Sequence, residues 1–234
     1  MLKHLLITGA AQRLGLHCAQ ALVAQGYQVT ITYRTQHDSL KMLQQQGVQC
    51  LFADFSTDQG VKDFIQLAKQ QCPNLNAIIH NASSWHRDSL EQPESVFDAM
   101  MQVHAKAPYL INLALQAHFH ETLENIIHVS DFVAEAGSEK HIAYAASKAA
   151  MDNLTRSFAR KWAPKIRVNS IAPSMIIFND ADDEEYRHKA LQKSLLGVEA
   201  GAETFSQTVL YLLTNHYITG QVLALNGGRN LKLP

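Results

Sequence analysis

The sequence is poor in features that mark secreted, metal-binding or nucleic-acid-binding proteins. It has three cysteines in 234 residues, an odd number without a C-x-x-C pair, so neither a disulfide framework nor a zinc site is expected. Formal charges nearly cancel, at a net −1, so no overall field attracts nucleic acid or an anionic membrane. We therefore predict no metal and no nucleic-acid partner, and any anion must be bound by a local site.

Long apolar runs are also missing. No stretch approaches the roughly 20 apolar residues that a membrane-spanning helix needs. The apolar run near the start of the sequence is short and soon meets Thr8, Gln12 and Arg13, which favours a buried strand over a signal sequence. We expect no membrane association and a cytoplasmic location.

What the sequence contains is a regular alternation of strand-like and helix-like segments. Apolar runs predict strands at 2–8, 28–33, 49–53, 77–80, 125–130, 166–171 and 221–225. Amphipathic segments predict helices at 14–25, 39–46, 59–70, 93–117, 144–162 and 202–214. Parallel strands need crossover connections, so residues 1–234 are predicted to form one doubly wound α/β domain with a parallel sheet of about seven strands. A ligand would then lie beyond the carboxyl ends of the strands.

The first predicted strand runs into the turn T-G-A-A-Q-R-L-G at 8–15. Glycine between a strand and a helix lets backbone N–H groups and the helix N-terminus approach a pyrophosphate. The spacing is G-x5-G instead of G-x-G-x-x-G, and Arg13 stands where a glycine is common. Taken alone, this segment fits a turn without a ligand equally well.

The end of the second predicted strand indicates which nucleotide would bind. An NAD site usually has Asp or Glu there for the ribose 2′-hydroxyl, whereas this strand ends in Tyr33, Arg34 and Thr35. Arg34 could hold a 2′-phosphate and Thr35 could add a hydroxyl donor, which predicts NADPH as the cofactor; the alternative is a solvated surface arginine. After the third strand, Asp54 could accept from the adenine amino group or cap a helix.

Proton chemistry is indicated by Tyr144, Lys148 and Asp131. Tyr144 and Lys148 are four residues apart and share one face of a predicted helix. An adjacent ammonium is expected to lower the pKa of the phenol, so that the pair can exchange protons. Thirteen residues before Tyr144 stands Asp131. An ionised carboxylate has only acceptors and opposes a developing alkoxide, so Asp131 argues against a carbonyl substrate. The alternative is that Asp131 only caps its loop.

The turn H-N-A-S-S-W at 80–85 follows the fourth predicted strand. Its small residues could lie along a cofactor, with Asn81 bonded to the backbone or to a ribose. Trp85 offers a flat surface for a bicyclic ring, or is a core or interface residue. Ser83 and Arg13 could bond the polar edge of a substrate or the phosphates. The acidic stretch 179–185 fits a mobile loop near the substrate and a helix start equally well, and no contact is assigned to it.

Taken in order, these motifs resemble the short-chain dehydrogenase/reductase family over nearly the full length. The matching elements are the T-G-x5-G turn, the N-A-S turn at 81–83, Tyr144-x-x-x-Lys148 and V-N-S-I-A-P at 168–173. The resemblance implies a Rossmann-like fold, with Tyr144 as proton donor and Lys148 orienting the nicotinamide ribose. It also implies a homotetramer with the fourth and fifth helices at an interface.

Within that family the sequence is most similar to the pteridine reductases. The shared features are Arg13 in the glycine turn, Tyr-Arg-Thr at 33–35, N-A-S-S followed by an aromatic residue at 81–85, and Asp131. This resemblance implies NADPH-dependent reduction of a 7,8-dihydropterin, with hydride to C6 and a proton to N5. Dihydromonapterin is the expected substrate, and dihydrofolate a weaker one.

Two positions depart from the family pattern. His104 stands where many relatives have an Asn that helps a proton relay, and its imidazole either relays protons or has a structural role. Ser174 follows Pro173 where Pro-Gly is usual. Two further functions remain open from the sequence: a carbonyl or 3-oxoacyl thioester reductase, and a non-catalytic NADPH-binding regulator.

The predicted site residues form three groups. The predicted catalytic residues are Asp131, Tyr144 and Lys148. The predicted cofactor-binding residues are Gly9, Arg13, Leu14, Gly15, Tyr33, Arg34, Thr35, Asp54, Asn81, Ala82 and Lys148. The predicted substrate-binding residues are Arg13, Ser83, Trp85 and Tyr144.

Overall fold

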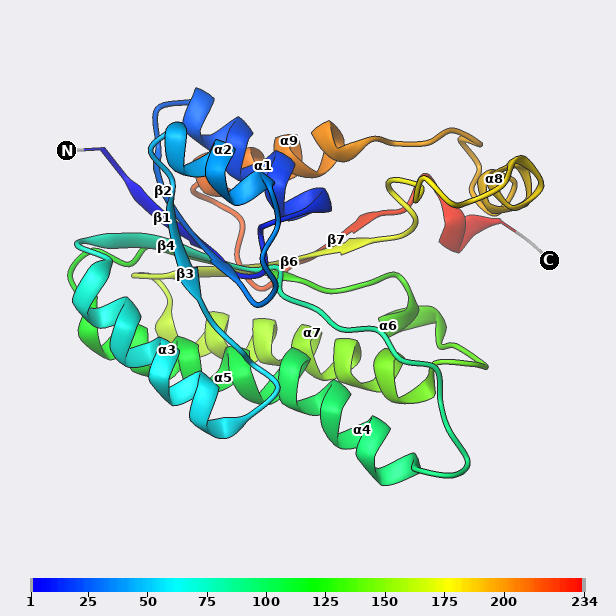
Figure 1. Ribbon diagram of the computed structural model, residues 1–234, viewed down its shortest axis with the longest axis horizontal. Coiled ribbons are helices and arrows are strands. Elements are labelled where there is room, and N and C mark those ends of the chain that lie inside the picture. Colours follow the sequence, from blue (N-terminus) through cyan, green and yellow to red (C-terminus); the bar gives the residue numbers. More distant parts are fainter. Residues whose placement is uncertain (1, 233–234) are drawn as a thin grey trace.

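A parallel sheet of seven strands runs through the middle of the structure, a computed structural model that describes residues 2–232 (Figure 1). The strand order is β3-β2-β1-β4-β5-β6-β7, and every neighbouring pair is parallel. The strands are β1 (His4–Ile7), β2 (Gln28–Tyr33), β3 (Gln49–Phe52), β4 (Leu75–His80), β5 (Asn125–Val129), β6 (Arg167–Pro173) and β7 (Val222–Leu225). The order reverses between β1 and β4, which places the ligand crevice at their carboxyl ends.

Helices cover both faces of the sheet (Figure 1). One face carries α1 (Arg13–Ala24), α2 (Ser39–Gln45) and α9 (Ala202–Thr214). The other carries α3 (Asp58–Gln71), α5 (Ala107–His118) and α7 (Ile142–Trp162), with α4 (Pro93–Met101) leading into α5. Three short helices, α6 (Val133–Ala136), α8 (Glu184–Leu191) and η2 (Arg229–Leu231), lie toward the carboxyl end of the sheet. The predicted doubly wound fold is confirmed.

The predicted helix over 93–117 is continuous but not uniform. Between α4 and α5 lies a π-helical turn, η1 (Gln102–Lys106), in which the Ala107 N–H donates to the carbonyl of Gln102, five residues back. The sequence does not predict α6 or η2, because a single turn carries no hydrophobic period. The acidic stretch does start a helix: the Asp183 side chain accepts from the Tyr186 N–H and caps α8.

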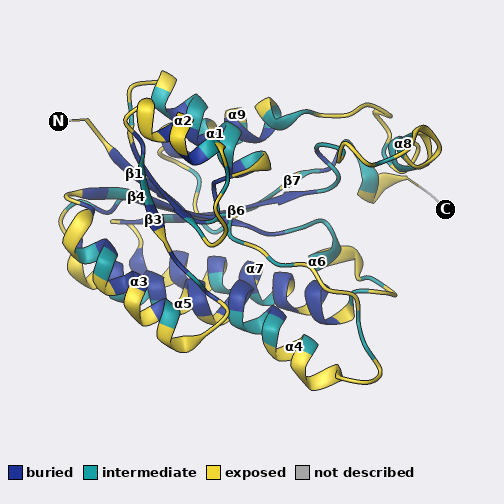
Figure 2. Cartoon of the chain, in the orientation of Figure 1, coloured by how far each residue is buried: buried dark blue, intermediate teal, exposed yellow. Residues whose placement is uncertain are grey.

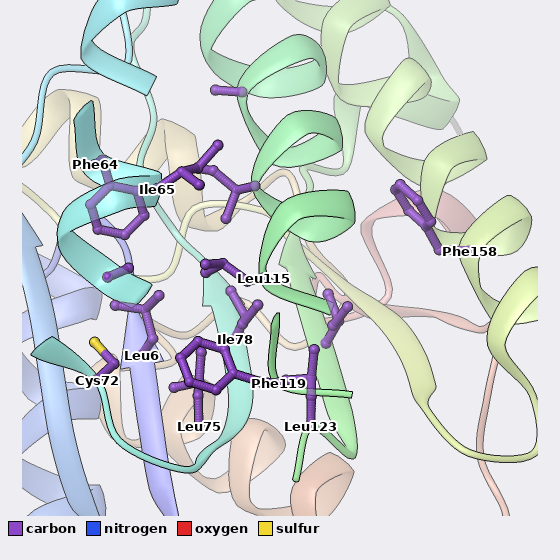
Figure 3. Packing of buried hydrophobic residues seen from close by; sticks show 14 of the residues in the cluster. Leu6, Phe64, Ile65, Cys72, Leu75, Ile78, Leu115, Phe119, Leu123 and Phe158 are labelled. Carbon is purple, nitrogen blue, oxygen red and sulfur yellow. The ribbon is translucent and has the colours of Figure 1, made fainter. Parts of the chain in front are cut away.

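Apolar side chains fill the space between the sheet and each helical layer. Figure 2 shows the strands and the inner helix faces buried, and the outer faces of α2, α3 and α4 exposed. In Figure 3, Phe64 of α3 and Leu115 of α5 lie over Leu6 and Ile78 of the sheet, and all four side chains are buried. Parallel strands buried on both faces explain why the sequence shows continuous apolar runs instead of alternation.

The three thiols are free, with Cys18 and Cys72 buried and Cys50 half-buried. Burial raises the pKa of Cys18 to about 12 and that of Cys72 to about 11, so both are inert thiols at neutral pH. Within residues 2–232 no helix is both long and apolar enough to cross a membrane. Over the same range, no cluster of three or more His, Cys, Asp or Glu side chains is arranged to hold a metal ion.

Candidate active site

The turn after β1 is packed tightly against the turn after β4. Gly9 has a φ of +63°, and a Cβ there would lie 2.6 Å from the Cα of Ala82. A Cβ on Gly15 would lie 2.6 Å from Nδ2 of Asn81. That amide group donates to the carbonyls of Thr8 and Gly9, at 3.1 and 2.8 Å. Asn81 therefore bonds the backbone, which was one of its two predicted roles. Only glycine fits at positions 9 and 15, which pack against this turn.

The N-terminus of α1 is open to an anion. The N-cap residue Gln12 makes no side-chain hydrogen bond to the helix, and the first turn carries no acidic residue. The first N–H groups of a helix have no partner inside the helix, and its dipole favours negative charge. This end of α1 can therefore receive a phosphate, as predicted for the segment that includes Leu14 and Gly15.

A cleft beside this helix end is lined by side chains from the first four βα turns. They include Gly9, Gln12, Tyr33, Arg34, Thr35, Phe55, Ser56, Ala82, Ser83 and Ser84. Arg34 and Thr35 are exposed at the mouth of the cleft, and no carboxylate ends β2. The Ser84 hydroxyl is buried at the cleft without a hydrogen-bond partner. An open helix end, a cationic rim and an unpartnered hydroxyl fit a dinucleotide that carries a 2′-phosphate, such as NADPH.

Asp54 lies next to this cleft but does not cap a helix. Its Oδ1 accepts from the Ser56 N–H at 3.0 Å, and that bond, with a smaller contribution from the charge of Arg34, lowers the pKa of Asp54. The interpretation of Asp54 as a helix cap is wrong, because Thr57 is the N-cap of α3 and accepts from the Gly60 N–H. Residues 54–57 include three residues of types that cap helices, Asp54, Ser56 and Thr57, and only the backbone conformation chooses among them.

Asp131 and Tyr144 meet at the carboxyl end of the sheet. The Tyr144 hydroxyl donates to Oδ2 of Asp131 at 2.9 Å. The other carboxylate oxygen, Oδ1, accepts from the Val133 N–H at 3.0 Å. Asp131 therefore bonds the backbone of its own loop just before α6 and contacts the phenol at the same time, so the two predicted roles are not exclusive.

The electrostatics of Tyr144 differ from the sequence-based expectation. Burial, the charge of Asp131 and the hydrogen bond to Asp131 raise the pKa of Tyr144 far above its usual value. The expectation that Lys148 lowers this pKa is wrong here, because Lys148 Nζ donates to the carbonyl of Val129 at 2.8 Å and stands 5.6 Å from the centre of the phenol ring. Tyr144 is therefore held as a protonated donor at neutral pH.

Lys148 is a buried ammonium supported by two carboxylates. Burial lowers its pKa to about 8, while the charges of Asp131 and Asp152 raise it. Asp152 lies one turn further along α7, is 8% exposed, and accepts from the Ser170 hydroxyl at 3.0 Å. Its own pKa is raised, chiefly by burial. Removing the charge of Asp152 should therefore lower the pKa of Lys148 further.

We expect kcat/KM to fall as the pH rises through about 8, the lowered pKa of Lys148 in the folded protein. A depressed lysine is an ammonium below that pH and neutral above it, so activity that needs the cation is present on the acid side. Asp152→Asn should move this descending limb to lower pH, because Asp152 raises the pKa of Lys148. Steady-state pH profiles measure both effects, with exposed Glu135→Gln as the matched control. A limb that stays in place in Asp152→Asn contradicts this account.

Other residues of the site were not predicted, and their sequence signals differ in strength. Asp88 caps α7: its carboxylate accepts from the N–H groups of Ile142 at 2.7 Å and Ala143 at 3.2 Å. It lies 54 residues before Ile142, so no local pattern could identify it. Ser147 and Asp152 could have been found, because they stand on α7 at helical spacing from Tyr144 and Lys148.

Two predicted substrate residues lie at the rim of the site. Trp85 is 65% exposed and stacks on His141, with ring centres 4.0 Å apart, so its interpretation as a core residue is wrong. Arg13 donates to the Asn179 side chain and to the carbonyl of Ile177. The stretch 179–185, to which no contact was assigned, therefore does reach the glycine turn. Neither residue hydrogen-bonds to Tyr144, whose hydroxyl donates to Asp131.

The sequence of this chain is similar to those of known proteins over nearly its whole length. A family model described as enoyl-(acyl carrier protein) reductase matches residues 9–230. The dihydromonapterin reductase of Klebsiella pneumoniae subsp. pneumoniae is 49% identical over 233 residues, which is 97% of each chain. That of Citrobacter koseri is 48% identical over 233 residues and 97% of each chain.

A solved structure agrees with these relatives. FolM alternative dihydrofolate reductase 1 from Brucella canis, complexed with NADP, superposes with a TM-score of 0.89 at 26% identity, over 99% of this chain and 95% of the other. The matched family model covers most of the chain, including the glycine turn after β1 and the Tyr144-x-x-x-Lys148 pair on α7. The chain belongs to the short-chain dehydrogenase/reductase family.

Proposed function

We propose that the protein is an NADPH-dependent reductase of 7,8-dihydropterins, with dihydromonapterin as its preferred substrate and dihydrofolate as a slower one. The observation that carries this proposal is the 2.9 Å hydrogen bond from Tyr144 to Asp131. A carbonyl reductase needs hydrogen-bond donors around the substrate oxygen, and a carboxylate in that place opposes the negative charge that develops. A ring nitrogen that must gain a proton is served by a carboxyl group.

Tyr144, Asp131 and Lys148 have separate roles in the proposed reaction. When bound, NADPH would supply the hydride for C6 of the pterin. Tyr144 stays protonated because its pKa is raised, so it can donate a hydrogen bond or a proton. Asp131 accepts a hydrogen bond from this phenol, so the carboxylate must first take up a proton, from Tyr144 or from solvent, before it passes that proton to N5 directly or through one water. The buried ammonium of Lys148 stabilises the negative charge that this pair holds once a proton has left it.

The cofactor proposal rests on the glycine turn and on Arg34. The relatives at 48–49% identity are dihydromonapterin reductases, and the Brucella canis structure is complexed with NADP. In this chain the open N-terminus of α1 would hold the pyrophosphate, and Arg34 with Thr35 would hold the 2′-phosphate.

Arg34→Ala is expected to weaken NADPH binding by roughly tenfold to a hundredfold, because a charge-assisted hydrogen bond contributes about 1.5–3 kcal/mol. NADH has no 2′-phosphate, so its affinity should change little, and the preference between the two cofactors should shrink by the same factor. Fluorescence titration of both cofactors gives the comparison. Arg87→Ala, at an exposed arginine that does not line the cleft, is the matched control. Equal losses for NADH and NADPH would contradict the assignment.

The proposed activity is tested by NADPH oxidation with dihydromonapterin, dihydrobiopterin, dihydrofolate and a simple ketone. We expect turnover of the pterins, dihydrofolate more slowly, and none of the ketone. Turnover of the ketone alone would favour a carbonyl reductase. NADPH binding without turnover of any of them would favour a regulator.

We further propose that the protein is cytoplasmic and assembles as a homotetramer through α5 and α7. The half-exposed Tyr109 on α5, which lies 5.9 Å from Phe158 of α7 between ring centres, supports this interface. Light scattering with size-exclusion chromatography measures the assembly, and Tyr109→Glu should shift it toward smaller species. An unchanged tetramer in that variant would place the interface elsewhere.

A further inference from the structure

His104 lies at the centre of the site, on the π-helical turn η1. Its side chain is buried and its ring meets that of Tyr144 edge to face, with 5.3 Å between ring centres. Nδ1 is 2.8 Å from the Ser147 hydroxyl, and Nε2 is 2.8 Å from the Ser83 hydroxyl and 3.3 Å from the Ser84 N–H. Both ring nitrogens thus form hydrogen bonds with protein groups: Nδ1 with α7, and Nε2 with the turn after β4.

The hydrogen bonds fix the tautomer. The Ser147 hydroxyl donates to the carbonyl of Tyr144 at 2.7 Å, so its single hydrogen is used. Ser147 can therefore only accept from His104, which places a proton on Nδ1. A backbone N–H can only donate, and the Ser84 N–H points at Nε2, which must be the acceptor. His104 is neutral and carries its hydrogen on Nδ1.

We propose that His104 is a positioning residue that holds Ser83 and the first turn of α7 in fixed positions relative to each other, and that it transfers no proton during the reaction. With Nε2 as an acceptor, the Ser83 hydroxyl donates inward and presents its oxygen lone pairs to the cleft. Ser83 then accepts from a ring N–H or amino group of the substrate. The inference rests on the proposed function, in which Ser83 contacts the pterin and Tyr144 and Asp131 serve N5.

The electrostatic surroundings agree with a neutral ring. Burial, followed by the positive charge of Lys148, lowers the pKa of His104 to about 2. From α7, the groups that face the ring are Tyr144 and Lys148, neither of which favours an imidazolium. Both ring nitrogens already have protein partners, so neither is free to bind a water. Where many relatives have an Asn that assists a proton relay, this chain has a histidine held by hydrogen bonds to Ser83, Ser84 and Ser147.

The first test is spectroscopic and needs no turnover. In protein labelled with nitrogen-15 on histidine, two-bond correlations of His104 should show a neutral ring with hydrogen on Nδ1 and no titration between pH 5.5 and 8. His104→Gln identifies the resonance. Hydrogen on Nε2, or a titration within that range, would overturn the proposal even if the protein reduces pterins as proposed.

The second test separates positioning from proton transfer. Glutamine offers one donor and one acceptor, as the neutral ring does, but cannot carry a proton at neutral pH. We expect His104→Gln to retain most of kcat with an unchanged pH profile and solvent isotope effect. His104→Phe, which offers neither group, should raise the pterin KM by roughly tenfold, the effect of one lost hydrogen bond. His216→Phe, at an exposed histidine after α9, is the matched control.

A different pattern would identify a proton carrier. In that case His104→Gln would lose kcat as severely as His104→Phe, and its solvent isotope effect would rise, with KM unchanged. Because wild-type turnover of pterins is measured alongside, failure of the proposed function appears as an inactive wild type. Failure of the role of His104 appears only in the variants.

Discussion

Tyr144→Phe is expected to lower kcat for dihydropterin reduction by roughly 10²–10⁴-fold, the usual contribution of a positioned proton donor. The substitution removes only the hydroxyl that donates to Oδ2 of Asp131. The ring stays in its place beside His104, so the local packing is kept. Single-turnover measurement of NADPH oxidation reports the loss directly.

The control for this experiment is cofactor binding. The phenol oxygen is directed at Asp131, and Tyr144 does not line the cleft beside the N-terminus of α1. The affinity for NADPH should therefore change little. Tyr109→Phe removes a hydroxyl from a half-exposed tyrosine on α5 and should leave kcat unchanged. A Tyr144→Phe protein that keeps most of its kcat would show that Asp131 alone delivers the proton.

The arrangement of the fold follows from the sequence because its signals are local. Continuous apolar runs and amphipathic segments alternate, and the right-handed crossover rule leaves few topologies open. The π-helical turn at 102–106 could not be predicted in this way, because it differs from an α-helix by one added residue in the hydrogen-bond ladder. That added residue is part of the turn on which His104 is presented to the site.

The contents of the site follow from the sequence less completely than the fold. Tyr144 and Lys148 are four residues apart on one helix, so their proximity is a local property. The direction of the Tyr144 pKa is not local, because it depends on burial and on a carboxylate that arrives from the end of β5. The cap of α7 by Asp88 crosses 54 residues, and only the folded chain brings the two together.

Asp131→Asn is expected to lower dihydropterin turnover by roughly 10²–10³-fold, because an amide cannot deliver a proton to N5. The fold should be kept, since the amide oxygen can still accept from the Val133 N–H. Two of the three causes that raise the pKa of Tyr144 come from Asp131, so this pKa should fall toward its usual value. Glu135→Gln, at an exposed carboxyl four residues away, should leave turnover unchanged.

Asp131→Ser distinguishes the pterin reductase from a carbonyl reductase. A hydroxyl supplies the donor that a developing alkoxide needs and removes the carboxylate that opposes it. If the natural substrate were a ketone or a thioester, this variant would keep or raise ketone turnover. We expect instead that it loses dihydropterin reduction about as completely as Asp131→Asn, because a serine hydroxyl is too weak an acid to give its proton to N5. Parallel assays with dihydromonapterin and a simple ketone decide between the two: loss of pterin turnover without ketone turnover supports the pterin reductase, and ketone turnover that is kept or raised supports the carbonyl reductase.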